Sequence, residues 1–107
     1  MAKRNLYNKS ASMRFLEKLT GGPPTFAELV RTVRECEQWT LEQTAKKLGV
    51  SRSHLCDVEK GRKSVSPERA AHWAGILGYS ESQFVRLAIQ ADLDASGLKY
   101  RVELKAA

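Results

Sequence analysis

The sequence predicts an all-α domain of five helices, with a short helical extension before it and a possible β-strand after it. Residues that favour helix N-caps recur at the start of five segments. Apolar residues inside those segments recur at three- and four-residue spacing, and glycine or proline residues separate all but the first two segments. The 107 residues suit one domain with a single modest core, which we place at residues 25–95.

A basic extension, residues 1–24, precedes this domain. Residues 1–9 are polar and aperiodic, so they either remain disordered or act as an arm that contacts phosphates or the minor groove. Residues 10–19 are compatible with a short helix whose apolar side is made by Met13, Phe15 and Leu16. Two glycines and two prolines at positions 21–24 cannot continue a helix, and they separate this segment from the domain.

The first helix of the domain is expected to begin at Thr25 and to end near Gln38. Thr25 and Glu28 have the spacing of a capping box, in which each residue satisfies a backbone N–H of the other. An apolar stripe follows at helical spacing, made by Phe26, Leu29, Val30 and Val33. Trp39 is expected to pack in the core between this helix and the next one.

Two short helices and a tight turn are expected next. A second capping box, at Thr40 and Gln43, starts the first of them. Its inward residues are Leu41, Ala45 and Leu48. Gly49 should end it, because that position needs a positive φ, which glycine adopts without steric cost. Ser51 is the expected N-cap of the second helix, which covers about residues 52–60. Leu55 and Val58 should anchor that helix, and Gly61 should end it.

Two further helices complete the predicted domain. Ser66 followed by Pro67 is an N-cap with proline at the first helical position, where a missing N–H costs nothing. Gly78 should follow the end of this helix, whose stripe is Ala70, Trp73, Ala74 and Leu77. Ser80 and Gln83 should cap the last helix, which ends before Gly97. Its stripe is Phe84, Leu87, Ala88 and Ala91.

The tail, residues 96–107, changes period. Its apolar residues are Leu98, Tyr100, Val102 and Leu104, and they alternate with charged residues at 99, 101, 103 and 105. Alternation of this kind is typical of a β-strand. Because a lone strand is not stable, we expect this one to pair with its copy in a dimer or with the N-terminal segment.

The spacing of residues 41–60 is that of a helix-turn-helix, a unit that lays its second helix in the major groove of DNA. Ala45 is small where the two helices cross, and Gly49 follows four residues later. The run Glu59-Lys60-Gly61-Arg62 resembles the end of the recognition helix in the Cro/phage-repressor-type (XRE) family of DNA-binding domains. The resemblance covers about residues 25–95 and implies a five-helix, lambda-repressor-like fold.

This chain departs from the family pattern at two positions. Thr44 stands where a larger aliphatic residue is usual, and Leu41 stands where many members carry a phosphate-contacting Gln, a role that Gln43 can take.

Four outward residues of the recognition helix are the expected base readers: Arg52, Ser53, Cys56 and Asp57. Arg52 is the first candidate, because a guanidinium can donate two hydrogen bonds to guanine, worth about 1–3 kcal/mol of discrimination against another base. Asp57 either accepts from a cytosine amino group or orients Arg52 or Lys60. Cys56 suits contact with a thymine methyl group, and His54 suits a base or the DNA backbone.

Backbone contacts are expected from residues on either side of that helix and from His54 and Lys60 within it. The set is Thr40, Gln43, His54, Lys60, Arg62, Lys63 and Ser64. The resemblance implies a different role for Glu59, which should pair with an arginine of the first helix, here Arg34, and lock the recognition helix in place.

The net charge of +6 and the pI near 9.6 favour a polyanionic partner. The positive excess lies in residues 1–18 and 46–69. Cys36 and Cys56 have no zinc or disulfide spacing, and we expect neither a metal nor a cofactor. The chain shows no signal peptide and no apolar run that could span a membrane, so the cytoplasm is the expected compartment.

A sequence-specific transcriptional regulator is the predicted function, acting as a homodimeric repressor on a two-fold operator. The alternative is an antitoxin of a toxin–antitoxin pair, since residues 66–94 are similar to HigA-type antitoxins, and such a protein would also bind DNA. A protein-interaction adaptor that has lost DNA binding is a third possibility. The sequence offers no nucleophile–base set, paired carboxylates, phosphate-binding glycine loop or metal cluster, so we do not expect an enzyme.

Overall fold

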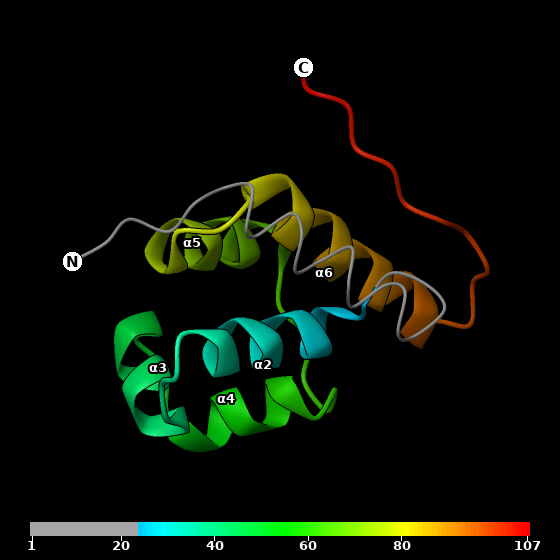
Figure 1. Ribbon diagram of the computed structural model, residues 1–107. Coiled ribbons are helices and arrows are strands. Elements are labelled where there is room, and N and C mark those ends of the chain that lie inside the picture. Colours follow the sequence, from blue (N-terminus) through cyan, green and yellow to red (C-terminus); the bar gives the residue numbers. More distant parts are fainter. Residues whose placement is uncertain (1–23) are drawn as a thin grey trace.

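The computed structural model describes residues 24–107, and these form five helices (Figure 1). The helices are α2 (Phe26–Cys36), α3 (Leu41–Leu48), α4 (Arg52–Glu59), α5 (Pro67–Leu77) and α6 (Glu81–Ala95). The predicted all-α fold class is therefore confirmed. The short helix and the basic arm that we expected in residues 1–23 lie outside the described residues.

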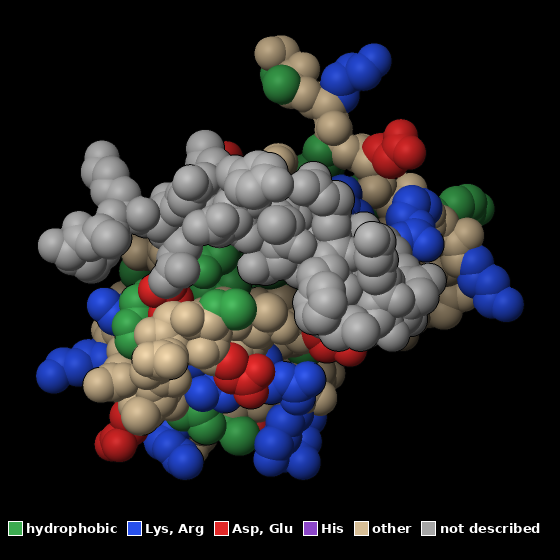
Figure 2. Space-filling model, in the orientation of Figure 1, with side chains coloured by type: hydrophobic (Ala, Val, Ile, Leu, Met, Phe, Trp, Pro, Cys, Tyr) green, Lys and Arg blue, Asp and Glu red, His purple; other side chains and the backbone are tan. Residues whose placement is uncertain are grey.

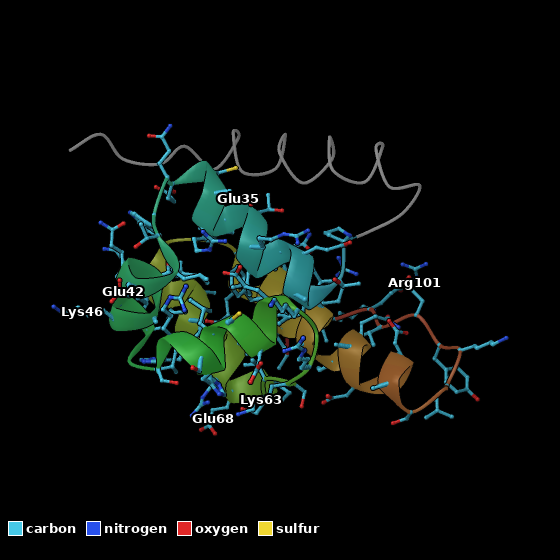
Figure 3. All side chains as sticks on the ribbon, turned by 90° about the horizontal axis from the view of Figure 1, so that it is seen from below. Glu35, Glu42, Lys46, Lys63, Glu68 and Arg101 are labelled. Atoms are coloured by element: carbon cyan, nitrogen blue, oxygen red, sulfur yellow. The ribbon has the colours of Figure 1, made fainter. Side chains whose placement is uncertain are left out.

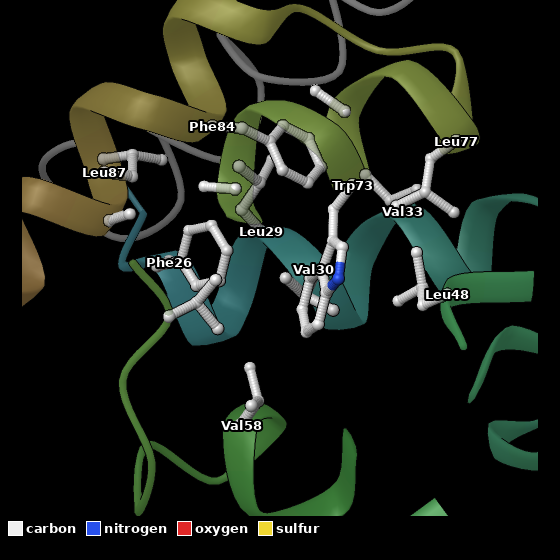
Figure 4. Packing of buried hydrophobic residues seen from close by; sticks show 14 of the residues in the cluster. Phe26, Leu29, Val30, Val33, Leu48, Val58, Trp73, Leu77, Phe84 and Leu87 are labelled. Atoms are coloured by element: carbon white, nitrogen blue, oxygen red, sulfur yellow. The ribbon is translucent and has the colours of Figure 1, made fainter. Parts of the chain in front are cut away.

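Helix α2 lies at the centre of the fold, with α4 on one side and α6 on the other (Figure 1). Helices α5 and α6 form a closely packed pair, and α3 packs against α4 and α5. The apolar stripes expected on these helices meet in one core (Figure 4). Its centre is aromatic: the rings of Phe26 and Trp73 stack at 6.3 Å, and the ring of Phe84 meets Phe26 edge-on at 5.9 Å.

The start of each helix is fixed by a capping side chain. Thr25 and Thr40 both form complete capping boxes, with Glu28 and Gln43. Serine hydroxyls accept the first free backbone N–H groups of the other three helices, from Ser51, Ser66 and Ser80. All five caps were expected, because each depends only on residues three positions apart in the sequence.

The turns between the first three helices fix the position of α4. Gly49 has the expected positive φ, 72°, and the N–H of Val50 bonds to the carbonyl of Ala45 at 3.0 Å. The turn between α2 and α3 was not foreseen in detail. Helix α2 ends at Cys36, two residues before the expected end, because Gln38 adopts a left-handed φ of 60° and the N–H of Trp39 returns to the carbonyl of Arg34. Trp39 is half-buried beside the core.

The tail forms no strand within one chain: residues 98–107 have no regular secondary structure. The β-strand expected here is not observed, because a strand that has no partner for its backbone hydrogen bonds is not stable. Helix α6 closes with Gly97 at φ 76° and with a hydrogen bond from the Leu98 N–H to the Leu93 carbonyl. From there the chain stays beside α6, where Gln90 bonds to the backbone of Tyr100 and Val102, and its last residues then lead away from the helices (Figure 1). Among the described helices, none is both long and apolar enough to cross a membrane.

Candidate nucleic-acid interface

Helix α4 lies at the edge of the fold, and its outer side faces away from the other helices (Figure 1). Leu55 and Val58 are buried on its inner side. Arg52 and Ser53 are exposed at its first turn, while Cys56 and Asp57 are half-buried one turn later. The sides of α4 that we expected to be buried and exposed therefore agree with the burial in the structure. Arg52 makes no side-chain hydrogen bond or ion pair with any described residue, which leaves its guanidinium available to a ligand.

The contact expected between Arg34 and Glu59 is present. Arg34 Nε donates to Glu59 Oε2 at 2.8 Å, and Nη2 donates to Oε1 at 3.0 Å. The third nitrogen, Nη1, donates to the Trp39 carbonyl at 3.2 Å. The hydrogen bond to Glu59 raises the pKa of Arg34 against the lowering effect of burial, so the guanidinium stays charged. One side chain thus ties α2 to the start of α3 and to the end of α4, which fixes the angle of α4.

Asp57 has partners that the sequence did not indicate. Its carboxylate lies 3.6 Å from Arg62 Nη1 and 4.0 Å from Lys63 Nζ, in ion pairs with the loop after α4. Its main-chain carbonyl also accepts from the N–H of Arg62 at 2.8 Å. The expectation that Asp57 orients Arg52 or Lys60 is therefore wrong, because the loop folds back after Gly61 and brings Arg62 and Lys63 to this carboxylate.

The start of α3 keeps free donors for a phosphate. In the capping box, Gln43 uses its Oε1 to accept from the Thr40 N–H at 2.8 Å, and Thr40 Oγ1 accepts from the Gln43 N–H at 3.0 Å. The Gln43 amide nitrogen and the Thr40 hydroxyl hydrogen remain exposed at the positive end of the helix. The same box that starts α3 therefore presents the polar groups expected to contact the DNA backbone.

Basic side chains lie on α3 and around α4. In Figure 2, Lys and Arg side chains gather along the lower edge of the molecule, around α3 and α4. Seen from below, Lys46 extends outward from α3, and Lys63 lies beside α4 (Figure 3). One lysine has a structural contact: Lys47 Nζ lies 4.7 Å from the centre of the Trp39 ring, a cation–π distance.

A family model described as a helix-turn-helix domain matches residues 25–87. The chain belongs to the helix-turn-helix family. The resemblance to the XRE branch, drawn from the Glu-Lys-Gly-Arg run and the α3–α4 spacing, is confirmed.

One solved structure is similar to this helix-turn-helix chain: an HTH_3 family transcriptional regulator from Vibrio cholerae, 28% identical, with a TM-score of 0.51. The match covers 66% of this chain and 39% of that one. The chain therefore spans less than half of the length of the regulator that it matches. Comparison with curated proteins gives no match.

Thr44, a departure from the family pattern, is fully buried in the helix-turn-helix unit. Its hydroxyl donates to the Thr40 carbonyl at 3.0 Å, so the buried oxygen is satisfied inside its own helix. From the periodicity of α3 we expected Leu41, and not Thr44, to face inward. In the structure Leu41 is only half-buried. A buried threonine that bonds to its own helix has no distinctive sequence pattern.

Arg69 was not among the expected DNA-contacting residues, although α5 places it beside α4. Its Nη1 lies 3.5 Å from His54 Nε2, on the exposed side of both helices. No sequence spacing links residues 54 and 69, because the contact depends on how α5 packs. Arg69 adds a positive charge next to the first turn of α4.

The remaining backbone-contacting candidates border a hollow of about 1340 Å³. Lys60, Arg62, Lys63 and Ser64 line it from the α4–α5 loop, and α2, α6 and the tail form its other sides. In residues 24–107 no cluster of three His, Cys, Asp or Glu side chains could hold a metal ion.

Proposed function

We propose that this helix-turn-helix protein is a sequence-specific DNA-binding transcriptional regulator, with α4 as the recognition helix in the major groove. The observation that carries the proposal is the arrangement of α4: its inner side is buried, its N-terminal turn is exposed, and the Arg34–Glu59 pair holds it to α2. A rigid helix with a free outer side can enter a groove of duplex DNA without rearrangement.

In this proposal Arg52 reads a guanine through two hydrogen bonds, and Ser53 contacts a base or a phosphate nearby. Cys56 and Asp57 lie one turn further along, where Asp57 meets a cytosine amino group only if it leaves its loop partners. Thr40 and Gln43 hold one phosphate at the start of α3, and the basic loop holds another. His54 contacts the DNA backbone together with Arg69.

Regulation would follow from occupancy. A homodimer on a two-fold operator, with half-sites about 34 Å apart, would place two copies of α4 in successive major grooves on one side of the duplex. Such a dimer represses by blocking polymerase. The similar protein from Vibrio cholerae is a transcriptional regulator, which supports this assignment at the level of the shared domain.

Selection of bound duplexes from a random pool tests the proposal. We expect enrichment of a motif with two-fold symmetry, and an affinity that falls steeply with salt because bound phosphates release counterions. The charge-preserving variant Arg52→Lys is the matched control: it keeps the salt dependence but loses the two-point fit to guanine, so preference at one base pair should relax. Failure to enrich any sequence would refute the proposal.

The antitoxin alternative requires a protein partner in addition to DNA. A candidate surface for this partner is the tail, where Leu98, Tyr100 and Leu104 are exposed. A toxin-like reading frame next to the gene, whose product co-purifies with this chain and is neutralised by it, would support the antitoxin assignment. Normal growth of cells that express that product alone would exclude it.

A further inference from the structure

Helix α6 carries a second apolar row on the side turned away from the core. We call this the outer row, and it consists of Val85, Ile89 and Leu93. At about 100° per residue, these side chains lie roughly 100°, 140° and 180° around the helix axis from Phe84, which is fully buried. All three are half-buried, and none belongs to the core of the described residues or to the half-buried residues that pack against it. A helix that is apolar on two sides needs a partner for each of them.

The described elements that pack against α6 lie on its other sides. Helices α2 and α5 meet it in the core, where Phe84 and Leu87 are buried (Figure 4). The tail follows the side of Gln90, which holds it by two hydrogen bonds and lies about 100° around the axis from Ile89. The outer row is therefore left for a partner beyond residues 24–107.

Residues 10–19, which lie outside the described residues, have the pattern of such a partner. As a helix, this segment would place Phe15, Leu16 and Leu19 within about 100° of one another, with Met13 beside them. The opposite side would hold its charged residues, Arg14, Glu17 and Lys18. A helix of this length is not stable alone in water, so it needs a surface on which to bury its apolar side.

The chain joins this segment to the domain close to α6. Pro24 is fully buried just before α2, and the ring of Phe26 meets that of Phe84 on α6 at 5.9 Å. Five residue steps separate Leu19 from Pro24, and an extended chain spans at most about 3.6 Å per step, so Leu19 lies within about 18 Å of Pro24. A helix is only about 10 Å across, so this linker reaches the outer side of α6. Such a short tether also gives the segment a millimolar effective concentration, which favours it over a separate molecule.

The charges of the two partners are complementary. Helix α6 has three acidic residues and one basic residue: Glu81, Asp92, Asp94 and Arg86. Residues 1–18 have five basic residues and one acidic residue. Opposite net charges attract, so the N-terminal segment is drawn to α6 rather than repelled from it.

We propose that residues 10–19 form an amphipathic helix that docks on the outer row of α6 in the same chain. The apolar sides of the two helices face each other, and the charged side of the segment faces water. Helices α4 and α6 lie on opposite sides of α2 (Figure 1), so the docked segment leaves the outer side of α4 uncovered.

Hydrogen exchange of the full chain without DNA tests the docking. In the wild-type chain the amides of residues 13–19 should exchange at least about tenfold more slowly than those of an unstructured chain. Leu16→Gln and Ile89→Gln should each remove this protection, because each replaces an apolar group of one docking side with a polar amide. The five described helices should stay protected in both variants. Lys18→Gln is the matched control on the charged side of the segment, and it should leave residues 13–19 protected.

A disulfide provides a second measurement. Leu16 and Ile89 lie near the middle of their apolar rows, so they come close whichever way the segment runs along α6. In a background with Cys36→Ser and Cys56→Ser, Leu16→Cys combined with Ile89→Cys should form a disulfide within one chain under mild oxidation. Arg14→Cys combined with Ile89→Cys should react about tenfold more slowly, because residue 14 lies on the charged side.

Three results would overturn the proposal. Residues 13–19 could exchange as fast as an unstructured chain in the wild-type protein. Their protection could survive both glutamine substitutions. The disulfide could link only two different chains, which would assign the outer row to the segment of a second copy. Loss of DNA binding by a chain whose segment is docked would count against the proposed function instead, because α4 takes no part in the docking.

Discussion

Replacing Glu59 with glutamine removes the charge that holds α4 to α2. Glu59 accepts two hydrogen bonds from Arg34, at 2.8 and 3.0 Å, and the Glu59 and Arg34 side chains are 6% and 17% exposed. Hydrogen bonds with charged groups contribute about 1.5–3 kcal/mol, and removing one partner of a fully buried pair costs about 3–5 kcal/mol. Glutamine keeps one acceptor, and Arg34 keeps some solvent, so we expect a loss of about 2 kcal/mol in the free energy of unfolding.

That loss corresponds to a fall of about 8 °C in Tm for a domain of this size. Thermal and urea unfolding followed by far-ultraviolet circular dichroism would measure it. Glu42→Gln is the matched control, since Glu42 is an exposed residue of α3, and it should change stability by less than about 0.5 kcal/mol. In a double-mutant cycle with Arg34→Gln, the coupling energy should exceed about 1 kcal/mol.

DNA affinity should fall together with stability, because α4 loses its fixed angle. A Glu59→Gln protein that unfolds at the wild-type temperature but no longer binds DNA would refute the reasoning. Glu59 would then contact the duplex itself, and the bond to Arg34 would be incidental to the position of α4.

Three other changes test the turn and the basic loop. Gly49→Ala should cost about 1 kcal/mol, because φ is +72° while no atom lies within 4 Å of the added Cβ; Gly75→Ala, equally uncrowded inside α5, should raise Tm instead. Lys63→Ala should weaken binding to all sequences alike and reduce the salt slope by about one, unlike a change at Arg52. Asp57→Asn should raise affinity for random duplexes, since it frees two cations of the loop from an ion pair. Equal melting temperatures for the two glycine variants would contradict the argument from φ. Identical binding profiles for the Lys63 and Arg52 variants would contradict the division between backbone contact and base reading. Unchanged affinity of Asp57→Asn for random duplexes would contradict the role of its ion pairs.

The helices and their starts could be predicted because their determinants are local. A capping box needs residues three apart, and the left-handed end of α3 needs a glycine at one position. The contact between Arg34 and Glu59 spans 25 residues and came from resemblance to a family rather than from spacing.

Other contacts had no such pattern. Gln38 takes a left-handed φ that a glycine would have signalled, and Asp57 finds partners in a loop that folds back on α4. The bond between His54 and Arg69 depends on the packing of α5, and that between Gln90 and the tail depends on the path of the chain after α6. Side-chain contacts between elements leave no periodic trace in one sequence.

Methylation interference on a selected operator tests most directly whether the outer side of α4 lies in the major groove. Methylation at guanine N7 blocks that groove, and Arg52 should bond to this atom. We expect methylation of one guanine in each half-site to prevent binding of the wild-type chain, and the effect at that guanine to disappear for Arg52→Ala. Interference confined to adenine N3, in the minor groove, would contradict a recognition role for α4.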